Sequence, residues 1–289
     1  MSLLLDSHKR DIARKIERER DARPAYTPSK PIDAGSADAA PARAIHLTKA
    51  STIKPRPVRW LWKDRAALGT LTLVGGREGI GKSILVYSIV ADITRGRLEG
   101  DCYGTPRAVI IVATEDSWEH TIVPRLMAAG ADLDRVYRVD VATSDLMNTT
   151  LSLPRDIANL EEAIREVNAA ALVLDPLLSR LDVKLDSHKD QQVRLALEPL
   201  VAIADRTRLT QFGLIHVNKS DTNDPLSSLM GSRAFAAVAR SVLFVMTDPD
   251  DENTRLLGTP KNNLGRLDLP TLSFRIDGAK VAQTEEGEV

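Results

Sequence analysis

The sequence predicts an α/β domain whose central sheet is mainly parallel, flanked by helices and closed by a C-terminal β-meander. Two apolar runs, at residues 108–113 and 169–174, lack the alternation of a half-exposed strand. Runs of this kind are typical of strands that are buried on both faces, as in parallel sheets. Segments with helical spacing of apolar residues follow each run, and this alternation of strand and helix indicates an α/β fold.

A third observation is the segment from Thr70 to Ser83, in which an apolar run leads through a glycine-rich turn into an amphipathic segment. Residues 76–83 fit G-x-x-x-x-G-K-[ST], the pattern of a loop that binds the phosphates of a nucleotide. Glycines let backbone N–H groups converge on a phosphate at a helix N-terminus. The predicted nucleotide-binding residues are Gly76, Arg77, Glu78, Gly79, Ile80, Gly81, Lys82, Ser83 and Ile84.

The motif also predicts a metal site, with ATP and Mg²⁺ as the cofactors. Lys82 can reach the β and γ phosphates, and the Ser83 hydroxyl can take one position on the Mg²⁺ that bridges them. The run at 169–174 ends in Asp175, which is the pattern of a Walker B strand. A carboxylate at the C-terminal end of such a strand lies where ligands bind in open α/β sheets. The alternative is a strand that merely ends in an acid before a turn.

The remaining elements follow from the same patterns. Helices are expected at 154–167, 191–208 and from near residue 232, and strands at 135–141 and 210–218. The meander is expected from strands near 241–246, 254–261 and 270–276, with an Asp- and Pro-containing turn at 248–251.

The chain is expected to divide into three parts. Residues 1–57 contain a densely charged segment at 7–23, interpreted as a solvated helix, and a flexible linker rich in Pro and Ala at 24–57. The α/β domain is expected to cover 58–277, and 278–289 is expected to be a C-terminal tail. Trp60 and Trp62, at the start of the domain, are interpreted as packing against its core; the alternative is stacking on a base.

Composition limits the classes of function. The net charge of −1 provides no global field that recruits nucleic acid, so any such contact must come from local loops. The single cysteine, Cys102, excludes an internal disulfide framework and a zinc site built from cysteines. No apolar run approaches the roughly 18 residues of a membrane span, so we expect a cytoplasmic protein without a membrane partner.

The order of the motifs resembles the AAA_25 or RepA-like hexameric helicase group, over roughly residues 58–277. The resemblance implies the fold of a RecA-like P-loop NTPase, and therefore a RecA-like ATPase domain at 58–277. One departure is Arg77-Glu78, where similar proteins often have Asp-Pro, so this loop is bulkier and more charged. The resemblance rests on Trp60-Leu61-Trp62, the phosphate loop, Thr114-Glu115-Asp116, Asp175, His216-Val217-Asn218-Lys219, Gly231-Ser232-Arg233, Ala239-Arg240-Ser241 and Lys261-Asn262-Asn263-Leu264-Gly265.

The resemblance also implies roles for residues outside the phosphate loop. Glu115, expected on the strand next to the phosphate-loop strand, is the candidate base or water-orienting group. The alternative for Glu115 is a carboxylate that stabilises a helix N-terminus. His216 resembles the polar residue that reads the γ-phosphate, although a buried structural histidine fits as well. Arg240 and Lys261, with Arg233 as a further candidate, are expected to act on the phosphates of a neighbouring subunit.

Together these features predict a Mg²⁺-dependent ATP hydrolase that forms a homo-hexamer. The resemblance implies a ring motor on single-stranded DNA in plasmid, phage or mobile-element replication, with loops 178–190 and 218–231 gripping the strand. These loops carry few cations and no aromatic residue for stacking on bases. The alternatives are an ATP-binding regulatory switch or loader, and a small-molecule kinase. The loop cations are Arg180, Lys184, Lys189 and Lys219.

Overall fold

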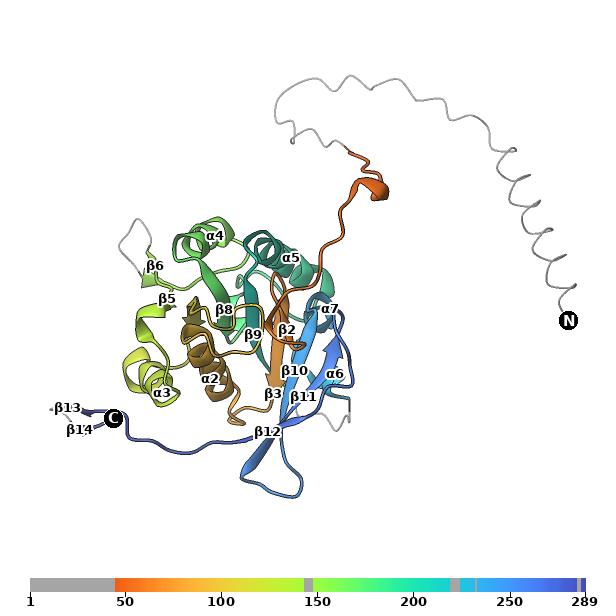
Figure 1. The fold of residues 1–289 in the computed structure, drawn as a ribbon. Helices are drawn as coiled ribbons and strands as arrows, with labels where there is room; N and C mark the ends of the chain where they lie inside the picture. Colours follow the sequence, from red (N-terminus) through yellow and green to blue (C-terminus); the bar gives the residue numbers. More distant parts are fainter. Residues whose placement is uncertain (1–44, 143–147, 219–223, 232, 285–286) are drawn as a thin grey trace, which may run out of the picture. The chain divides into compact units, whose positions relative to one another are not determined.

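The computed structural model describes residues 45–142, 148–218, 224–231, 233–284 and 287–289 (Figure 1). The chain divides into two units, Met1–Pro55 and Arg56–Val289. The predicted helix at 7–23 and most of the predicted linker lie outside the described residues. The described part of the first unit contains the 3-10 turn η1 (Ala50–Thr52). The predicted divisions after residues 57 and 277 stay predictions.

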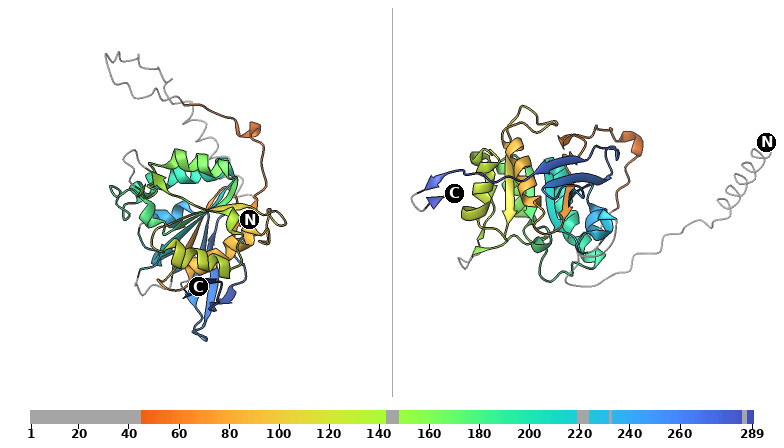
Figure 2. Two further views of the ribbon diagram at one scale, coloured as in Figure 1. Left: turned by 90° about the vertical axis from the view of Figure 1, so that its left-hand side faces the viewer. Right: turned by 90° about the horizontal axis from the view of Figure 1, so that it is seen from below.

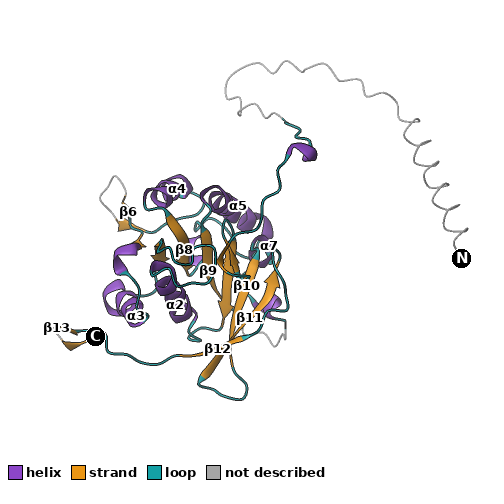
Figure 3. Cartoon of the chain, viewed as in Figure 1, coloured by secondary structure: helices purple, strands orange, loops and turns teal. Residues whose placement is uncertain are grey.

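The second unit is built on an eight-stranded sheet with the order β12-β11-β10-β3-β9-β8-β4-β5. The six strands from β10 to β5 pair in parallel, whereas β11 and β12 pair antiparallel and form the predicted meander. The α/β prediction with a mainly parallel sheet is therefore confirmed (Figure 3). The strands are β3 (Leu71–Gly76), β4 (Ala108–Ala113), β5 (Val136–Arg138), β8 (Ala169–Asp175), β9 (Thr210–His216), β10 (Ser241–Thr247), β11 (Thr254–Asn262) and β12 (Leu272–Arg275).

Three small two-stranded sheets complete the strands of the unit. They pair β1 (Trp60–Trp62) with β2 (Ala66–Ala67), β6 (Val141–Ala142) with β7 (Asn148–Thr149), and β13 (Gln283–Thr284) with β14 (Gly287–Glu288). Trp62 of β1 packs against the buried core, as predicted, while Trp60 is half-buried and Leu61 between them is fully buried.

Helices cover both faces of the sheet, as the edge-on view in Figure 2 shows. In β3, Leu71 and Leu73 belong to one core and Val74 to the other, because successive side chains of a strand point to opposite faces. The first core is packed by α4, α5 and α7, and the second by α2 and α3. The helices are α2 (Lys82–Thr94), the π-helix η2 (Trp118–Ile122), α3 (Val123–Ala128), α4 (Ile157–Glu166), α5 (Asp190–Thr207), α6 (Pro225–Ser228) and α7 (Ala234–Val238), with 3-10 turns η3 (Leu133–Arg135) and η4 (Leu178–Arg180).

An ion-pair cluster joins α4 to α5. Glu161 accepts hydrogen bonds from Arg206 of α5, at 2.5 Å, and from Arg165 of its own helix, at 2.7 Å. The bonds from Arg206 and then from Arg165 lower the pKa of Glu161 to about 2. This carboxylate therefore stays charged over nearly the whole pH range of the folded protein.

The parallel strands end at one edge of the sheet, and this edge gathers the predicted residues of the phosphate loop and the metal site. Gly76, the last residue of β3, lies opposite His216, the last residue of β9. Ala113 of β4 lies opposite Asp175 of β8 in the same way. Among the described residues, none of the helices combines the length and the hydrophobicity that crossing a lipid bilayer needs.

Candidate nucleotide site

The turn between β3 and α2 requires its glycines. Gly79 and Gly81 have φ angles of +71° and +102°, which side chains disfavour. A Cβ atom on Gly76 would come within 2.8 Å of the Val245 carbonyl oxygen. Gly81 is the N-cap of α2 and has no side chain to cap it, so the first N–H groups of the helix stay available to an anion.

Lys82 is the first residue of α2 and turns its side chain back into this loop. Its Nζ donates to the carbonyl oxygens of Gly76, at 3.0 Å, and Arg77, at 2.9 Å. The same atom lies 3.3 Å from Nδ1 of His216. Burial lowers the pKa of Lys82, while the carboxylates around it act in the opposite direction. The loop thus holds a buried cation where a phosphate chain would lie.

Ser83 and Asp175 form the predicted pair at the end of β8. The Ser83 hydroxyl donates to Asp175 Oδ2 at 2.7 Å, which leaves the lone pairs of the hydroxyl oxygen free for a cation. Burial raises the pKa of Asp175, the bond from Ser83 lowers it, and nearby Asp116 and Glu115 raise it again. A divalent cation would relieve this repulsion between carboxylates.

The chemistry of these donors fits Mg²⁺. This ion takes oxygen ligands and keeps several waters, so one or two protein oxygens together with phosphate oxygens are enough to hold it. In the described part of the chain, no three or more His, Cys, Asp or Glu side chains are placed to enclose a metal. Ser83 and Asp175 are therefore suited to an ion that arrives with a phosphate chain, and less to a resident metal.

The site residues surround one cavity of about 250 Å³. Lys82, Ser83, Glu115, Asp175 and His216 all line it, so the structure brings together five of the predicted functional residues. Glu78, Gly79, Gly81 and Ile84 line it as well.

The comparisons with known proteins agree with this geometry. The model of the AAA domain family AAA_25 matches residues 38–222, which is more than half of the chain. The chain belongs to the AAA_25 family. The family match and the relatives below place it among RecA-like P-loop ATPases.

The AAA_25 chain is similar to proteins named DNA repair protein RadA. It is 27% identical to the one from Chlamydia pneumoniae over 220 residues, covering 76% of this chain and 42% of the relative. With the one from Chlamydia muridarum it shares 24% identity over 254 residues, covering 86% of this chain and 49% of the relative. The AAA_25 chain therefore spans less than half the length of these curated relatives.

One detail of the prediction for the AAA_25 site is wrong. Glu115 was expected on the strand next to the phosphate-loop strand, but β9 and β8 lie between β3 and β4. These two strands come later in the chain and enter the sheet between the earlier pair, while Glu115 still reaches the cavity from the end of β4. Arg77 and Ile80 line a second cavity of about 370 Å³, and their contact with a nucleotide stays a prediction.

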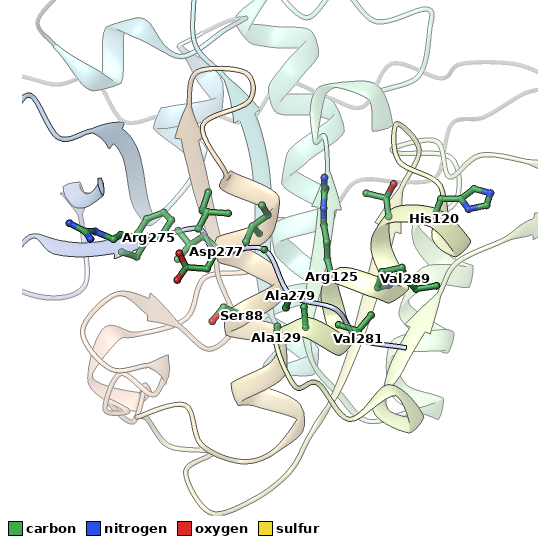
Figure 4. Close-up of a pocket in the computed structure, with 17 residues that line it drawn as sticks. Ser88, His120, Arg125, Ala129, Arg275, Asp277, Ala279, Val281 and Val289 are labelled. Atoms are coloured by element: carbon green, nitrogen blue, oxygen red, sulfur yellow. The ribbon is translucent and has the colours of Figure 1, made fainter. Parts of the chain in front are cut away.

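Sequence reasoning missed a pair at the rim of the site. Arg125 of α3 binds Asp116 at 3.0 Å, and both residues line the 250 Å³ cavity. Arg125 also lines a larger cavity of about 570 Å³ between α2, α3 and residues 274–281, and Figure 4 shows it near the middle of the labelled side chains. Asp116 stood out as part of an acidic run, but an arginine nine residues later on a helix carries no sequence signal of its own.

The candidate trans-acting residues lie at the opposite edge of the sheet. The Arg240 N–H donates to the carbonyl oxygen of Leu71, the first residue of β3. Lys261 lies opposite Val242 near the start of β10, and its Nζ donates to the Ala236 carbonyl at 2.5 Å. Neither residue lines the cavity beside its own phosphate loop. Arg233 is exposed just before α7.

The loops predicted to bind DNA, 178–190 and 218–231, present fewer exposed cations among the described residues than expected. Arg180 was counted among their cations, but it is 3% exposed and its Nη2 donates to Thr114 Oγ1 at 2.8 Å. Arg180 is the last residue of η4, and its guanidinium reaches Thr114, the residue that follows β4. In the other loop, residues 219–223, including Lys219, lie outside the described residues.

Proposed function

We propose that the chain hydrolyses ATP in a Mg²⁺-dependent reaction at this site. The observation that carries the proposal is the meeting of Lys82, the Ser83–Asp175 pair and Glu115 in one cavity at the start of α2. Lys82 binds the β and γ phosphates, and Ser83 and Asp175 hold the metal ion. Bound Mg²⁺ supplies charge neutralisation between the phosphates.

Glu115 is the proposed base or water-orienting residue. It is exposed just after β4, which β9 and β8 separate from β3 in the order of the sheet, and it lines the cavity together with Lys82 and Ser83. An in-line attack requires the water and the leaving group to lie on opposite sides of the γ-phosphate. His216, beside the Lys82 ammonium, is the proposed reader of that phosphate.

The 570 Å³ cavity is the proposed site of the nucleoside. Arg125 and Ile84 line both cavities, so a triphosphate in the smaller one continues into the larger one. Apolar side chains such as Leu85, Pro124 and Phe274 line the larger cavity, as expected for a flat base. The Arg125 guanidinium can stack on such a base.

We further propose that the chain works as a homo-hexameric ring on single-stranded DNA. The placement of Arg240 and Lys261 away from their own cavity supports a role on a neighbouring subunit, and the relatives named DNA repair proteins support DNA as the ligand. The resemblance to RepA-like helicases supports a task in plasmid, phage or mobile-element replication.

A regulatory switch or loader without helicase activity is the second candidate. The charges of the loops favour it: segment 178–190 holds three cations and three carboxylates, and one of the cations, Arg180, is buried. Such a protein would hydrolyse ATP at the same site without moving along DNA.

Light scattering after size exclusion, combined with ATPase rates with and without single-stranded DNA, tests these proposals. We expect a hexamer whose ATPase rate rises with DNA, loss of turnover and weaker ATP binding in Lys82→Ala, and retained binding without turnover in Glu115→Gln. Unchanged turnover of Lys82→Ala at saturating ATP would refute the proposed site. A hexamer whose ATPase ignores DNA would favour the switch.

A further inference from the structure

Arg180 is a buried cation whose hydrogen-bonding capacity is largely unused. Its side chain packs beneath the end of β4, where Nη2 binds the Thr114 hydroxyl. Its Nε and Nη1 atoms are enclosed and, within the described ranges, have no hydrogen-bond partner. Burying a guanidinium without partners is costly, so a native protein that keeps one needs a reason beyond stability.

The carboxylate that acts electrostatically on Arg180 belongs to Glu115, the proposed catalytic base. Burial lowers the pKa of Arg180, and Glu115 is the carboxylate that acts against this. Glu115 follows Thr114 directly in the chain, so the hydroxyl that anchors the guanidinium and the carboxylate belong to adjacent residues. Glu115 itself accepts no hydrogen bond from the described residues.

The backbone of Arg180 is fixed on both sides. Its N–H donates to the Leu177 carbonyl at 3.0 Å, and its carbonyl accepts from Leu153 at 2.7 Å. Leu177 in turn donates to Leu214 of β9. The guanidinium therefore extends from a backbone that is held in place on both sides, which a side chain that orients another residue requires.

We infer that Arg180 is a positioning residue that orients Glu115 through Thr114, whose hydroxyl its guanidinium binds. The inference rests on the proposed ATP hydrolysis. Arg180 lines neither cavity of the site, so it acts on the nucleotide only through Glu115. The role predicts that removal of Arg180 affects turnover and leaves ATP binding and the fold intact.

Arg180→Met tests this role because methionine fills the space without a charge. We expect a Tm no lower than that of the wild-type chain, since an apolar side chain replaces unpaired buried groups. The KM for ATP should stay unchanged while kcat falls about 10- to 100-fold, the loss typical when a partner that orients a metal-binding side chain is removed. Arg180→Lys should recover part of kcat.

Arg155→Met is the matched control. Arg155 binds Asp182, two residues after Arg180, at 2.9 Å, but its side chain is 66% exposed and lies outside the two cavities. The Arg155→Met variant should hydrolyse ATP at the wild-type rate.

A double-mutant cycle then tells whether Arg180 acts through Glu115. If it does, Arg180→Met combined with Glu115→Gln should be no slower than Glu115→Gln alone. Rate losses that multiply in the double variant, or a lower Tm together with lost activity in Arg180→Met, would overturn the inference. Normal turnover of Arg180→Met beside an inactive Glu115→Gln would also overturn the inference. That result would leave the proposed function intact. A wild-type chain without ATPase activity would overturn both.

Discussion

Replacing Ser83 by alanine should weaken the fold and the metal site by separate amounts. The substitution removes the 2.7 Å bond to Asp175, whose carboxylate is mostly enclosed. A hydrogen bond to a charged group contributes about 1.5–3 kcal/mol, and water can replace part of it at a half-buried site. We therefore expect a loss of about 1–2 kcal/mol without nucleotide, which lowers the Tm by roughly 2–8 °C in a domain of this size.

The metal site gives the second and larger effect. At a nucleotide concentration 100-fold above Kd, binding stabilises the wild-type fold by about 2.7 kcal/mol. Ser83→Ala should lose most of this gain when ATP is added with Mg²⁺, whereas the gain on adding ATP with EDTA should be the same in the variant and in wild type. Thermal unfolding followed by circular dichroism measures all four conditions.

Two further variants isolate the hydroxyl. Ser83→Thr keeps it and should restore both effects, whereas Ser273→Ala removes an exposed hydroxyl from β12, outside both cavities of the site, and should change neither. If Ser83→Ala unfolds like Ser273→Ala, the Asp175 bond contributes nothing. If it keeps the full Mg²⁺-dependent gain, Ser83 is not a metal ligand.

The other predictions concern the stability that Glu161 provides, the action of Arg240 on a neighbouring subunit, and Gly81 of the phosphate loop. The arginine partners of Glu161 stabilise the folded state above its ordinary pKa of 4.5, and this gain disappears as the pH falls through the folded value of about 2. Urea unfolding of Glu161→Gln should show a loss on the order of 1 kcal/mol at pH 7 that shrinks below pH 4.5, with no loss in Glu162→Gln. Rings mixed from Arg240→Ala and Lys82→Ala subunits should regain ATPase activity that each lacks alone; mixed oligomers that stay inactive would exclude a trans role of Arg240. Gly81→Ala forces a side chain into a strained turn, at about 1–3 kcal/mol, and should abolish binding in a fluorescent ATP titration; normal affinity would contradict the requirement for glycine.

Much of the fold could be predicted because local patterns determine it. The run at 169–174 had no alternation and forms a strand that is buried on both faces, and the glycine pattern before Lys82 forms the turn that its spacing requires. The acid at the end of the run, Asp175, lies at the sheet edge because parallel strands end together. Each of these features depends on a few adjacent residues.

The rest depends on the order of the strands in the sheet and on the burial of single side chains, and a short sequence pattern predicts neither. The residues around Glu115 do not indicate that β8 and β9, which come later in the chain, lie between its strand and the phosphate-loop strand. Arg180 looks like any cation of a polar loop, and only the turn of η4 beneath β4 shows that it is enclosed. The pairing of Asp116 with Arg125 likewise needs α3 to be placed before it can be seen.

The outer wall of the larger cavity comes from residues 274–281, and Ile276 lies against Gly81 of the phosphate loop. During synthesis this wall leaves the ribosome about 190 residues after the loop does, roughly 10–40 s later at 5–20 residues per second. The neighbours of β3 in the sheet, β9 and β10, are made before this wall, so the nascent chain can pair the phosphate-loop strand before it can enclose the larger cavity. If the nucleoside occupies this cavity as proposed, we expect full nucleotide affinity only when residues 274–281 have been made, and nucleotide binding by ribosome-bound chains of increasing length would report that moment.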